Sequence, residues 1–342
     1  MPELRLTIPA ELDGQTVRQA AMKGLGMSNG LFKRAKFHGQ VLLDGVPVLA
    51  NAAVRQGQNL LLSFPEKENT APAPVELGLR VAFEDEYLMM VDKPAPLPSA
   101  SSPRQALPTL ENAVYAYLGC PEDFVYRPVN RLDKGTSGLM LVAKTAYAQD
   151  QMQRLLHTDH FQREYLAVAE GRLPEKQGLI DLPIRKADGA TVKREVGPGG
   201  KEARTWYWVL REENNRSLVR LRLDTGRTHQ IRVHLSALGC PIVGDFLYGT
   251  ESEELPGRFA LHSFRCRFLH PVTGQWVERE NDPKEIFEPL LVRSSSRRDF
   301  RLRSTDTADM PSTVSRERTG AAKMLRKLSC HWSRHFTASA PP

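Results

Sequence analysis

The sequence predicts an α+β protein in which a mixed, mainly antiparallel sheet is preceded by a small α/β domain. Three observations support this class. The 342 residues exceed what one hydrophobic core usually needs, so we expect two folded units. Short segments of alternating apolar residues, typical of strands, recur between positions 80 and 223 with few helical segments among them. A stretch rich in proline separates this body from a compact N-terminal segment.

These boundaries divide the chain into a small domain (1–64), a linker (65–77), a strand-rich domain (78–292) and a basic tail (293–342). The tail holds nine arginines and two lysines against four acidic residues, which accounts for the whole formal charge of +7. We expect it to be disordered, because it is rich in serine and charge and poor in periodic apolar residues. Any case for a polyanion partner of the main body must therefore rest on local basic clusters.

Composition and targeting signals narrow the class further. Hydrophobic residues make up 41% of the chain and charged residues 25%, which excludes a wholly disordered or collagen-like protein. No apolar run approaches the ~20 residues that span a bilayer, and the start lacks the apolar core of a secretory signal. We therefore expect a cytoplasmic protein, and a monomer. The four cysteines form no C-x-x-C pair, which predicts reduced thiols and no zinc site.

The N-terminal domain has a recognisable order of elements. A helix over Val17–Met22 is followed by a second over Leu31–Phe37, a hairpin turning at Asp44-Gly45 and a strand over Asn59–Phe64. The plain interpretation is a small packing domain with a solvated helix face. The order also resembles the small RNA-binding module first seen in a ribosomal protein, and that resemblance implies that the second helix contacts RNA through its basic residues Lys33, Arg34 and Lys36.

The body alternates strands with a few capped helices. We expect one helix to begin after Thr109, one to carry Ala148 and Met152, and one to be capped by Thr228. The expected strands are Arg80–Phe83, Tyr87–Val91, Leu139–Ala143, Tyr165–Ala169, Thr205–Leu210 and Leu218–Leu223.

The first polar segment of the body covers residues 127–138 and runs into the buried strand Leu139–Ala143. It places Asp133 between two basic neighbours, Arg131 and Lys134. Every sheet protein needs turns rich in glycine and serine, so the segment alone does not decide between a structural and a catalytic role. Loops held by a rigid scaffold are nevertheless where catalytic groups tend to lie.

The second polar segment covers residues 223–235 and contains Arg232 in the first turns of a helix. His229 and His234 suggest a metal site, but a spacing of five residues does not put two imidazoles on one helix face. We therefore interpret these histidines, and also His262 and His270, as structural.

Taken in order, four segments carry a resemblance to a known family. They are Val91–Pro94, Asn130–Gly138, Arg163–Gly171, and Gly226–Leu235 continued by residues 239–249. Asn130–Gly138 resembles the H-R-L-D-x-x-T-S-G signature of the RluA family of RNA pseudouridine synthases. The third segment resembles the strand that carries this family's active-site tyrosine, and the others resemble its opening and third motifs.

The resemblance implies a catalytic set of Asp133, Tyr165 and Arg232. Pseudouridine formation breaks the glycosidic bond of a uridine, turns the uracil over and rejoins it through carbon. Asp133 would attack the ribose or assist departure of the base, and Arg232 would hold it ionised through a bidentate pair. Tyr165 would stack on the uracil and help to remove the proton from the carbon that becomes bonded to the sugar. An isomerisation of this kind requires no cofactor and no metal.

The family chemistry also implies contacts with RNA. The target uridine must be flipped out of its stack, and Arg131 would fill the space that it leaves. We expect phosphate contacts from Arg131, Lys134, Arg227 and the basic helix of the N-terminal domain.

Two departures from the family pattern affect loops rather than the catalytic set. Asn130 stands where the family usually has histidine, and Lys93–Ser99 lacks the usual glycine and histidine. Two other functions remain open: a non-catalytic RNA-binding or ribosome-assembly protein with the same fold, and a metal-dependent hydrolase that uses the histidines. The sequence also leaves open whether ribosomal or transfer RNA is the substrate.

Overall fold

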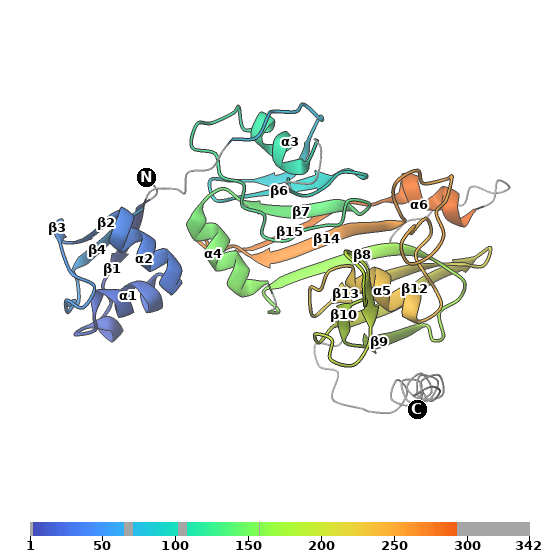
Figure 1. Cartoon of the computed structure of the whole chain (residues 1–342). Coiled ribbons are helices and arrows are strands. Elements are labelled where there is room, and N and C mark those ends of the chain that lie inside the picture. Colours follow the sequence, from blue (N-terminus) through green and yellow to red (C-terminus); the bar gives the residue numbers. More distant parts are fainter. Residues whose placement is uncertain (1–2, 65–70, 102–107, 157, 293–342) are drawn as a thin grey trace, which may run out of the picture. The chain divides into compact units, whose positions relative to one another are not determined.

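The structure is a computed structural model that describes residues 3–64, 71–101, 108–156 and 158–292 (Figure 1). The basic tail and part of the linker lie outside these residues. The chain divides into two compact units: the first runs to Leu166 and includes Glu251–Asp282, and the second contains Ala167–Thr250 and continues from Pro283. No helix within the described residues is long and apolar enough to cross a membrane.

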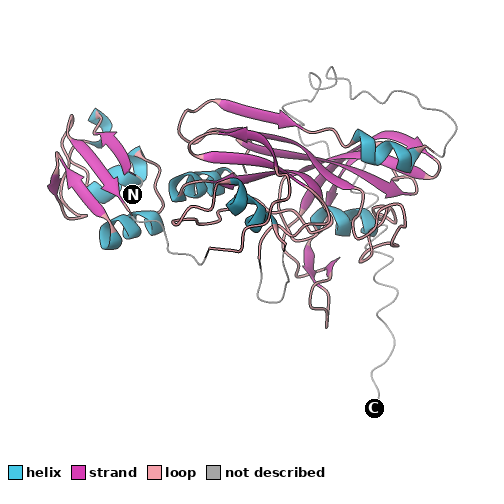
Figure 2. Ribbon diagram, turned by 90° about the horizontal axis from the view of Figure 1, so that it is seen from above, coloured by secondary structure: helices cyan, strands magenta, loops and turns pink. Residues whose placement is uncertain are grey.

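The N-terminal part of the first unit is a four-stranded antiparallel sheet with two helices packed against it (Figure 2). The expected helices and hairpin are confirmed. The first strand was missed, because its alternating residues Glu3–Thr7 are too few to stand out without the partner strand that they pair with. In sheet order the strands are β1 (Glu3–Thr7), β4 (Asn59–Ser63), β2 (Gln40–Leu43) and β3 (Val46–Pro47), and the helices are α1 (Val17–Gly24) and α2 (Asn29–His38), preceded by a short 3-10 turn at Ala10–Leu12.

Local sequence explains these elements. Thr16 caps α1 in a reciprocal capping box with Gln19, and the Ser28 hydroxyl accepts a hydrogen bond from the first turn of α2. Asp44 and Gly45 both have positive φ, 51° and 80°, which a two-residue hairpin turn of this hand requires.

The rest of the first unit is a mixed sheet in which β7 is parallel to β14 and antiparallel to β6. Every residue of β7 is buried, which explains why Leu139–Ala143 form a continuous apolar run. The strands, in sheet order, are β5 (Arg80–Glu84), β6 (Leu88–Lys93), β7 (Ser137–Ala143), β14 (Leu261–Leu269) and β8 (Phe161–Glu170), with β15 (Trp276–Glu280) paired to β14; the helices are α3 (Leu110–Tyr117) and α4 (Ala146–Leu155).

The second unit begins inside β8 and continues the mixed, mainly antiparallel pattern, so the predicted fold class is confirmed. Its strands follow the order β8, β13 (Arg216–Leu223), β12 (Arg204–Glu213) and β9 (Gln177–Asp181), and β10 (Ile184–Lys186) forms a separate ribbon with β11 (Arg194–Val196). Two helices complete the unit, α5 (Gln230–Ala237) and α6 (Lys284–Leu291).

The predicted cap of α5 at Thr228 is wrong. The helix starts at Gln230, and the residue before it, His229, has φ 58° and makes no side-chain cap. The Gln230 side chain orders the loop before the helix instead, because its oxygen accepts hydrogen bonds from the Thr225 hydroxyl and the Arg227 amide, each at 2.9 Å.

Two deeply buried histidines play the structural role expected of them. His234 on α5 bonds to the Thr205 hydroxyl at 2.9 Å and to the Leu182 carbonyl at 3.0 Å. His262 on β14 bonds to the Ser137 hydroxyl at 2.8 Å and to the Asn281 carbonyl. Burial disfavours the imidazolium and lowers the pKa of each ring to about 4.

These low pKa values predict a loss of stability in mild acid. Between about pH 6.5 and pH 4 these histidines are protonated in the unfolded chain but remain neutral in the folded protein. The free energy of unfolding therefore falls as the pH falls. Each histidine should contribute on the order of 3 kcal/mol to this fall. Urea unfolding at several pH values measures it, and His234→Gln should flatten the profile. An unchanged profile in that variant would show that His234 is not buried in its neutral form.

A second prediction concerns Gly138, which has φ +105° where β7 runs beside β14. A Cβ atom at this position would lie 2.3 Å from the Ser263 carbonyl oxygen, so backbone would have to move. Gly138→Ala should therefore reduce the free energy of unfolding by about 3 kcal/mol, more than the roughly 1 kcal/mol expected from positive φ alone. Gly274→Ala is the matched control, because Gly274 also has positive φ but open space around it. Equal losses in the two variants would contradict the close approach.

Candidate active site

The loop that carries Asp133 leads directly into β7. Asp133 is half-buried, and its carbonyl accepts a hydrogen bond from the Thr136 amide at 3.0 Å, which closes a tight turn. Thr136 and Ser137 are buried, whereas Lys134 is exposed. The carboxylate therefore projects from a turn that is built into the sheet.

Two side chains fix the segment that precedes this turn. The Ser99 hydroxyl donates to the Leu132 carbonyl at 2.6 Å and accepts from the Leu132 amide at 3.1 Å. Asn130 is buried, and its side-chain oxygen accepts a hydrogen bond from the Leu141 amide of β7 at 3.0 Å. The two departures from the family pattern thus lie at positions that brace the Asp133 loop, in agreement with the expectation that they affect loop shape.

Gly135 allows the loop to lie against an aromatic ring. A Cβ atom at Gly135 would come within 2.5 Å of the Phe259 ring, which is itself buried. Gly135, at a variable position of the signature, is therefore needed for close packing, and a larger residue would push the turn away from its support.

Lys93, at the end of β6, ties the Asp133 loop to the preceding loop. Its side chain is fully buried, and its ammonium donates to the carbonyls of Leu97 at 2.7 Å and Pro94 at 3.0 Å, with Lys134 at 3.5 Å. Burial lowers the pKa of Lys93 to about 7; the Asp133 charge raises it again in part, and the Arg258 charge lowers it. Sequence reasoning did not assign a role to Lys93, although a lysine directly after an apolar strand was a usable signal.

Tyr165 lies on β8 in the same unit, with only 4% of its surface exposed. Burial raises the pKa of its phenol, and the charge of Asp133 raises it further, whereas Arg163 and the Ser263 hydroxyl lower it. The structure therefore brings two members of the predicted set, Asp133 and Tyr165, within electrostatic reach of each other. At neutral pH Tyr165 is a neutral phenol.

A second polar chain runs beneath the start of β7. Arg258 donates to the Ser137 hydroxyl at 2.9 Å, and this hydroxyl bonds to the ring of His262 at 2.8 Å. Burial lowers the pKa of the Arg258 guanidinium. Sequence reasoning missed Arg258, which lies far from the recognised motifs.

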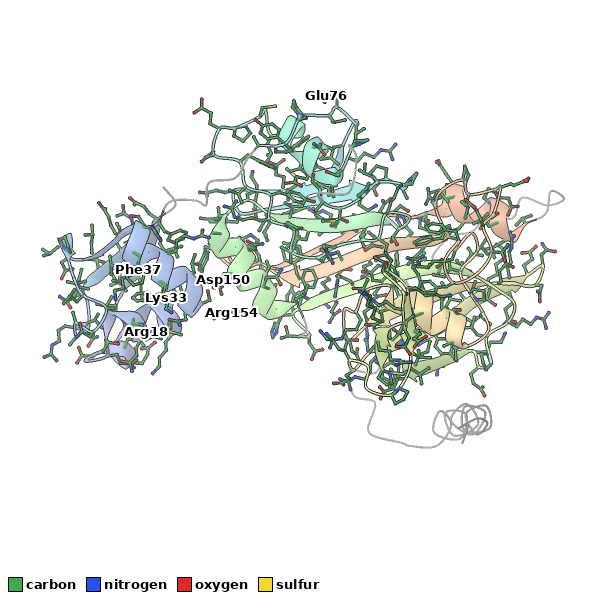
Figure 3. All side chains as sticks on the ribbon, in the orientation of Figure 1. Arg18, Lys33, Phe37, Glu76, Asp150 and Arg154 are labelled. Carbon is green, nitrogen blue, oxygen red and sulfur yellow. The ribbon has the colours of Figure 1, made fainter. Side chains whose placement is uncertain are left out.

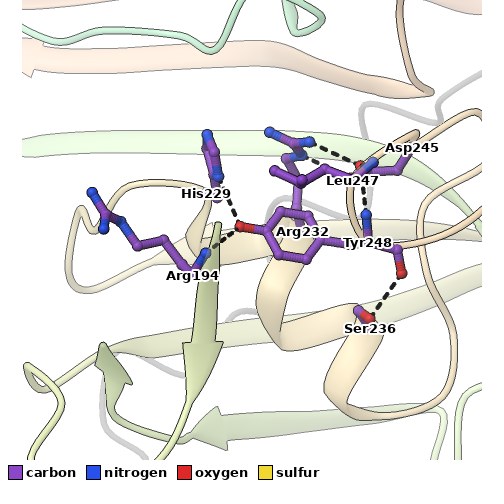
Figure 4. A network of polar contacts seen from close by, with 7 residues as sticks. All are labelled: Arg194, His229, Arg232, Ser236, Asp245, Leu247 and Tyr248. Carbon is purple, nitrogen blue, oxygen red and sulfur yellow. Dashed lines mark hydrogen bonds and ion pairs between the residues drawn. The ribbon is translucent and has the colours of Figure 1, made fainter. Parts of the chain in front are cut away.

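Arg232 belongs to the second unit, where it forms a buried ion pair. Its Nε donates to Asp245 Oδ2 at 2.7 Å and its Nη2 to Asp245 Oδ1 at 2.8 Å, and only 3% of Arg232 is exposed (Figure 4). Asp245 supplies the fork geometry that only arginine matches. The sequence indicated Asp245 only as part of a motif and gave it no role.

Asp245 and Tyr248 organise the loop around Arg232 (Figure 4). One Asp245 oxygen also accepts from the Leu247 amide at 3.0 Å and the Tyr248 amide at 3.2 Å. The Tyr248 hydroxyl accepts from the Arg194 amide and bonds to the His229 ring, while its ring centroid lies 4.9 Å from the Arg232 guanidinium carbon. The arginine is therefore held on two sides.

The residues predicted to contact RNA differ in exposure. Arg131 and Lys134 are exposed beside Asp133, and Lys33 and Lys36 are exposed on α2, where Figure 3 labels Lys33. Arg34 and Arg227 are half-buried, and Arg227 donates to the Glu202 carbonyl at 2.8 Å. Among the residues that the structure describes, no group of three or more His, Cys, Asp or Glu side chains could hold a metal ion.

Comparison with known proteins bears on this site. Residues 87–237 match the family model described as RNA pseudouridylate synthase. An uncharacterised RNA pseudouridine synthase of Bacillus subtilis, YhcT, is 34% identical over 81% of this chain and 92% of its own length. Ribosomal large subunit pseudouridine synthase D of Nitrosomonas europaea is 35% identical over 84% of this chain and 87% of its own.

A solved structure agrees with these relatives. Human RNA pseudouridylate synthase domain containing 1 superposes with a TM-score of 0.53 and 28% identity, covering 65% of this chain and 89% of that one. The match to the family model, over residues 87–237, includes Asp133, Tyr165 and Arg232. The chain is an enzyme that isomerises uridine in RNA, and it belongs to the RluA family of RNA pseudouridine synthases.

Proposed function

We propose that this enzyme converts specific uridines of structured ribosomal or transfer RNA to pseudouridine, with Asp133 as the essential carboxylate. The observation that carries the proposal is the position of Asp133: a half-buried carboxylate on a braced turn, in electrostatic contact with a buried lysine and with Tyr165. Relatives named ribosomal large subunit pseudouridine synthase D make ribosomal RNA the first substrate to test.

The reaction balances without a co-reactant. The bond between the ribose C1′ and N1 of uracil breaks, and a bond between C1′ and C5 forms after the base has turned. C5 loses a proton and N1 gains one, so there is no net oxidation and no group to carry. Asp133 attacks C1′ or assists departure of the base by stabilising positive charge that develops on the ribose, and either role requires its ionised form.

A buried cation lies within electrostatic reach of Asp133. The Asp133 charge raises the pKa of Lys93, and the Lys93 side-chain nitrogen is held in place by backbone carbonyls. Arg232 would add a second cation in the assembled site, and its orientation is already fixed by Asp245.

Tyr165 would meet the uracil through its ring. Because its pKa is raised, the resting phenol is neutral and presents an apolar face on which a base can stack. Proton removal from C5 by its oxygen would require the phenol to lose its own proton in the same step.

The target uridine would leave its stack before reaction, at a cost of roughly a few kcal/mol. Exposed Arg131 would occupy the vacated space, and phosphate contacts from Lys134, Arg227 and the basic residues of α2 would offset the cost. These contacts predict binding that weakens as salt is added. No cofactor enters this scheme.

Asp133→Asn provides the first test. Replacing the carboxylate by an amide preserves the shape of the side chain and removes its charge. Release of tritium from RNA labelled at uracil C5 should therefore be abolished, while RNA affinity should be unchanged. Asp92→Asn is the matched control, because Asp92 also acts on Lys93 but lies on β6, and it should retain turnover. A non-catalytic RNA-binding protein would show unchanged binding and no tritium release from the wild type. Turnover by Asp133→Asn would refute the proposed role.

A second test separates the stability of the Arg232–Asp245 pair from its function. Asp245→Asn leaves a buried guanidinium without its carboxylate and should lower the free energy of unfolding by about 3–5 kcal/mol. The double variant Arg232→Met/Asp245→Leu removes both charges and should recover much of that stability. It should nevertheless show no tritium release, because the cation expected to act on Asp133 is gone. Wild-type turnover in the double variant would show that Arg232 is structural only.

A further inference from the structure

The face of β12 that points away from α5 carries two parallel indole rings. Thr205 bonds to His234 and Gln230 of α5, so it faces that helix. Successive strand residues point to opposite faces, which puts Trp206 and Trp208 together on the other face. Their ring centroids lie 6.5 Å apart with planes 19° from parallel, and both side chains are half-buried.

An arginine from the neighbouring strand lies beside both rings. Arg222 of β13 is directly opposite Trp206, and its guanidinium carbon lies 6.0 Å from the Trp206 centroid and 5.9 Å from that of Trp208. In the part of the chain that the structure describes, Arg222 makes no ion pair with a carboxylate. Its charge is therefore available to an anion that approaches the indoles.

The Trp206 ring and the strand that carries both indoles are held in place before any ligand arrives. The Trp206 indole nitrogen donates to Asp224 at 3.0 Å, and β12 is paired on both sides, with β13 and β9. Rigid aromatic side chains lose little conformational freedom on binding, so a fixed pair is well suited to a planar ligand.

We propose that Trp206, Trp208 and Arg222 form a binding surface for an unpaired segment of RNA. Bases stack on the indole faces, and Arg222 binds a phosphate of the RNA between those bases. The ring spacing of 6.5 Å is about twice the roughly 3.4 Å rise of a stacked nucleic-acid strand, so it suits one base between the rings. Aromatic rings beside an arginine are the usual elements of a single-strand platform.

This surface is separate from the proposed catalytic residues of its unit. Arg232 lies on α5, which packs on the opposite face of the sheet. β9 is the last strand in the order, so RNA that touches both faces of this unit would pass around an edge such as β9. The proposal requires only that RNA is the substrate, and it stands whether or not Asp133 is the catalytic carboxylate.

The test measures binding of the full-length protein to an unstructured, fluorescently labelled oligouridylate at several salt concentrations. The double variant Trp206→Leu/Trp208→Leu should bind at least about tenfold more weakly, as expected when stacked bases lose their aromatic partners. Arg222→Gln should bind more weakly and lower the slope of log affinity against log salt by about 0.7, the value for one phosphate contact on a single strand. Affinity for a blunt RNA duplex should not change in either variant.

Two controls make the result specific. Trp276→Leu removes a tryptophan that is 45% exposed and also lies under an arginine, Arg267, but on β15; it should bind like the wild type. Trp206→Phe/Trp208→Phe retains two rings and should retain most of the affinity.

Three results would overturn the proposal. They are wild-type affinity in the double leucine variant, equal losses in the leucine and phenylalanine variants, and an unchanged salt slope in Arg222→Gln. If the double leucine variant does not fold, the affinity and salt slope of Arg222→Gln alone test the proposal. The proposal would also be overturned if the double leucine variant lost binding to a protein partner while it still bound oligouridylate.

Discussion

The buried ammonium of Lys93 is the constraint on which the Asp133 loop depends. It joins the loop after β6 to the turn before β7 through backbone carbonyls, and it has no exposed surface. Removing a charge from water is costly, which is why its pKa falls to about 7. The Asp133 carboxylate opposes that fall, because its negative charge favours the charged form of the lysine.

In the second unit, a buried ion pair holds Arg232 in place. Arg232 and Asp245 are both buried and joined by two hydrogen bonds, so neither can be removed alone without leaving an uncompensated charge. Tyr248 and the backbone amides of the 245–248 loop complete this support. Each unit thus holds one residue of the proposed catalytic set in place through buried charged groups.

Those parts of the fold that depend on local sequence patterns could be predicted from the sequence. The all-apolar run of β7, the Asp-Gly hairpin and the Thr109 cap were correct because each depends on neighbouring residues. The cap at Thr228 was wrong because the chain enters the helix one residue later, through His229 in a left-handed conformation. Lys93, Arg258 and Asp245 gained no role from sequence. The partner of Arg258 is distant in the chain, and only folding makes a lysine or a carboxylate fully buried.

The central claim is that this chain places pseudouridine in cellular RNA through Asp133. The most direct measurement is position-resolved pseudouridine mapping in total RNA from cells that lack the protein, with wild-type or Asp133→Asn protein restored. We expect defined pseudouridines to disappear in the deletion strain, to return with the wild type and to stay absent with the variant. Sites that persist without the protein, or that the variant restores, would contradict it.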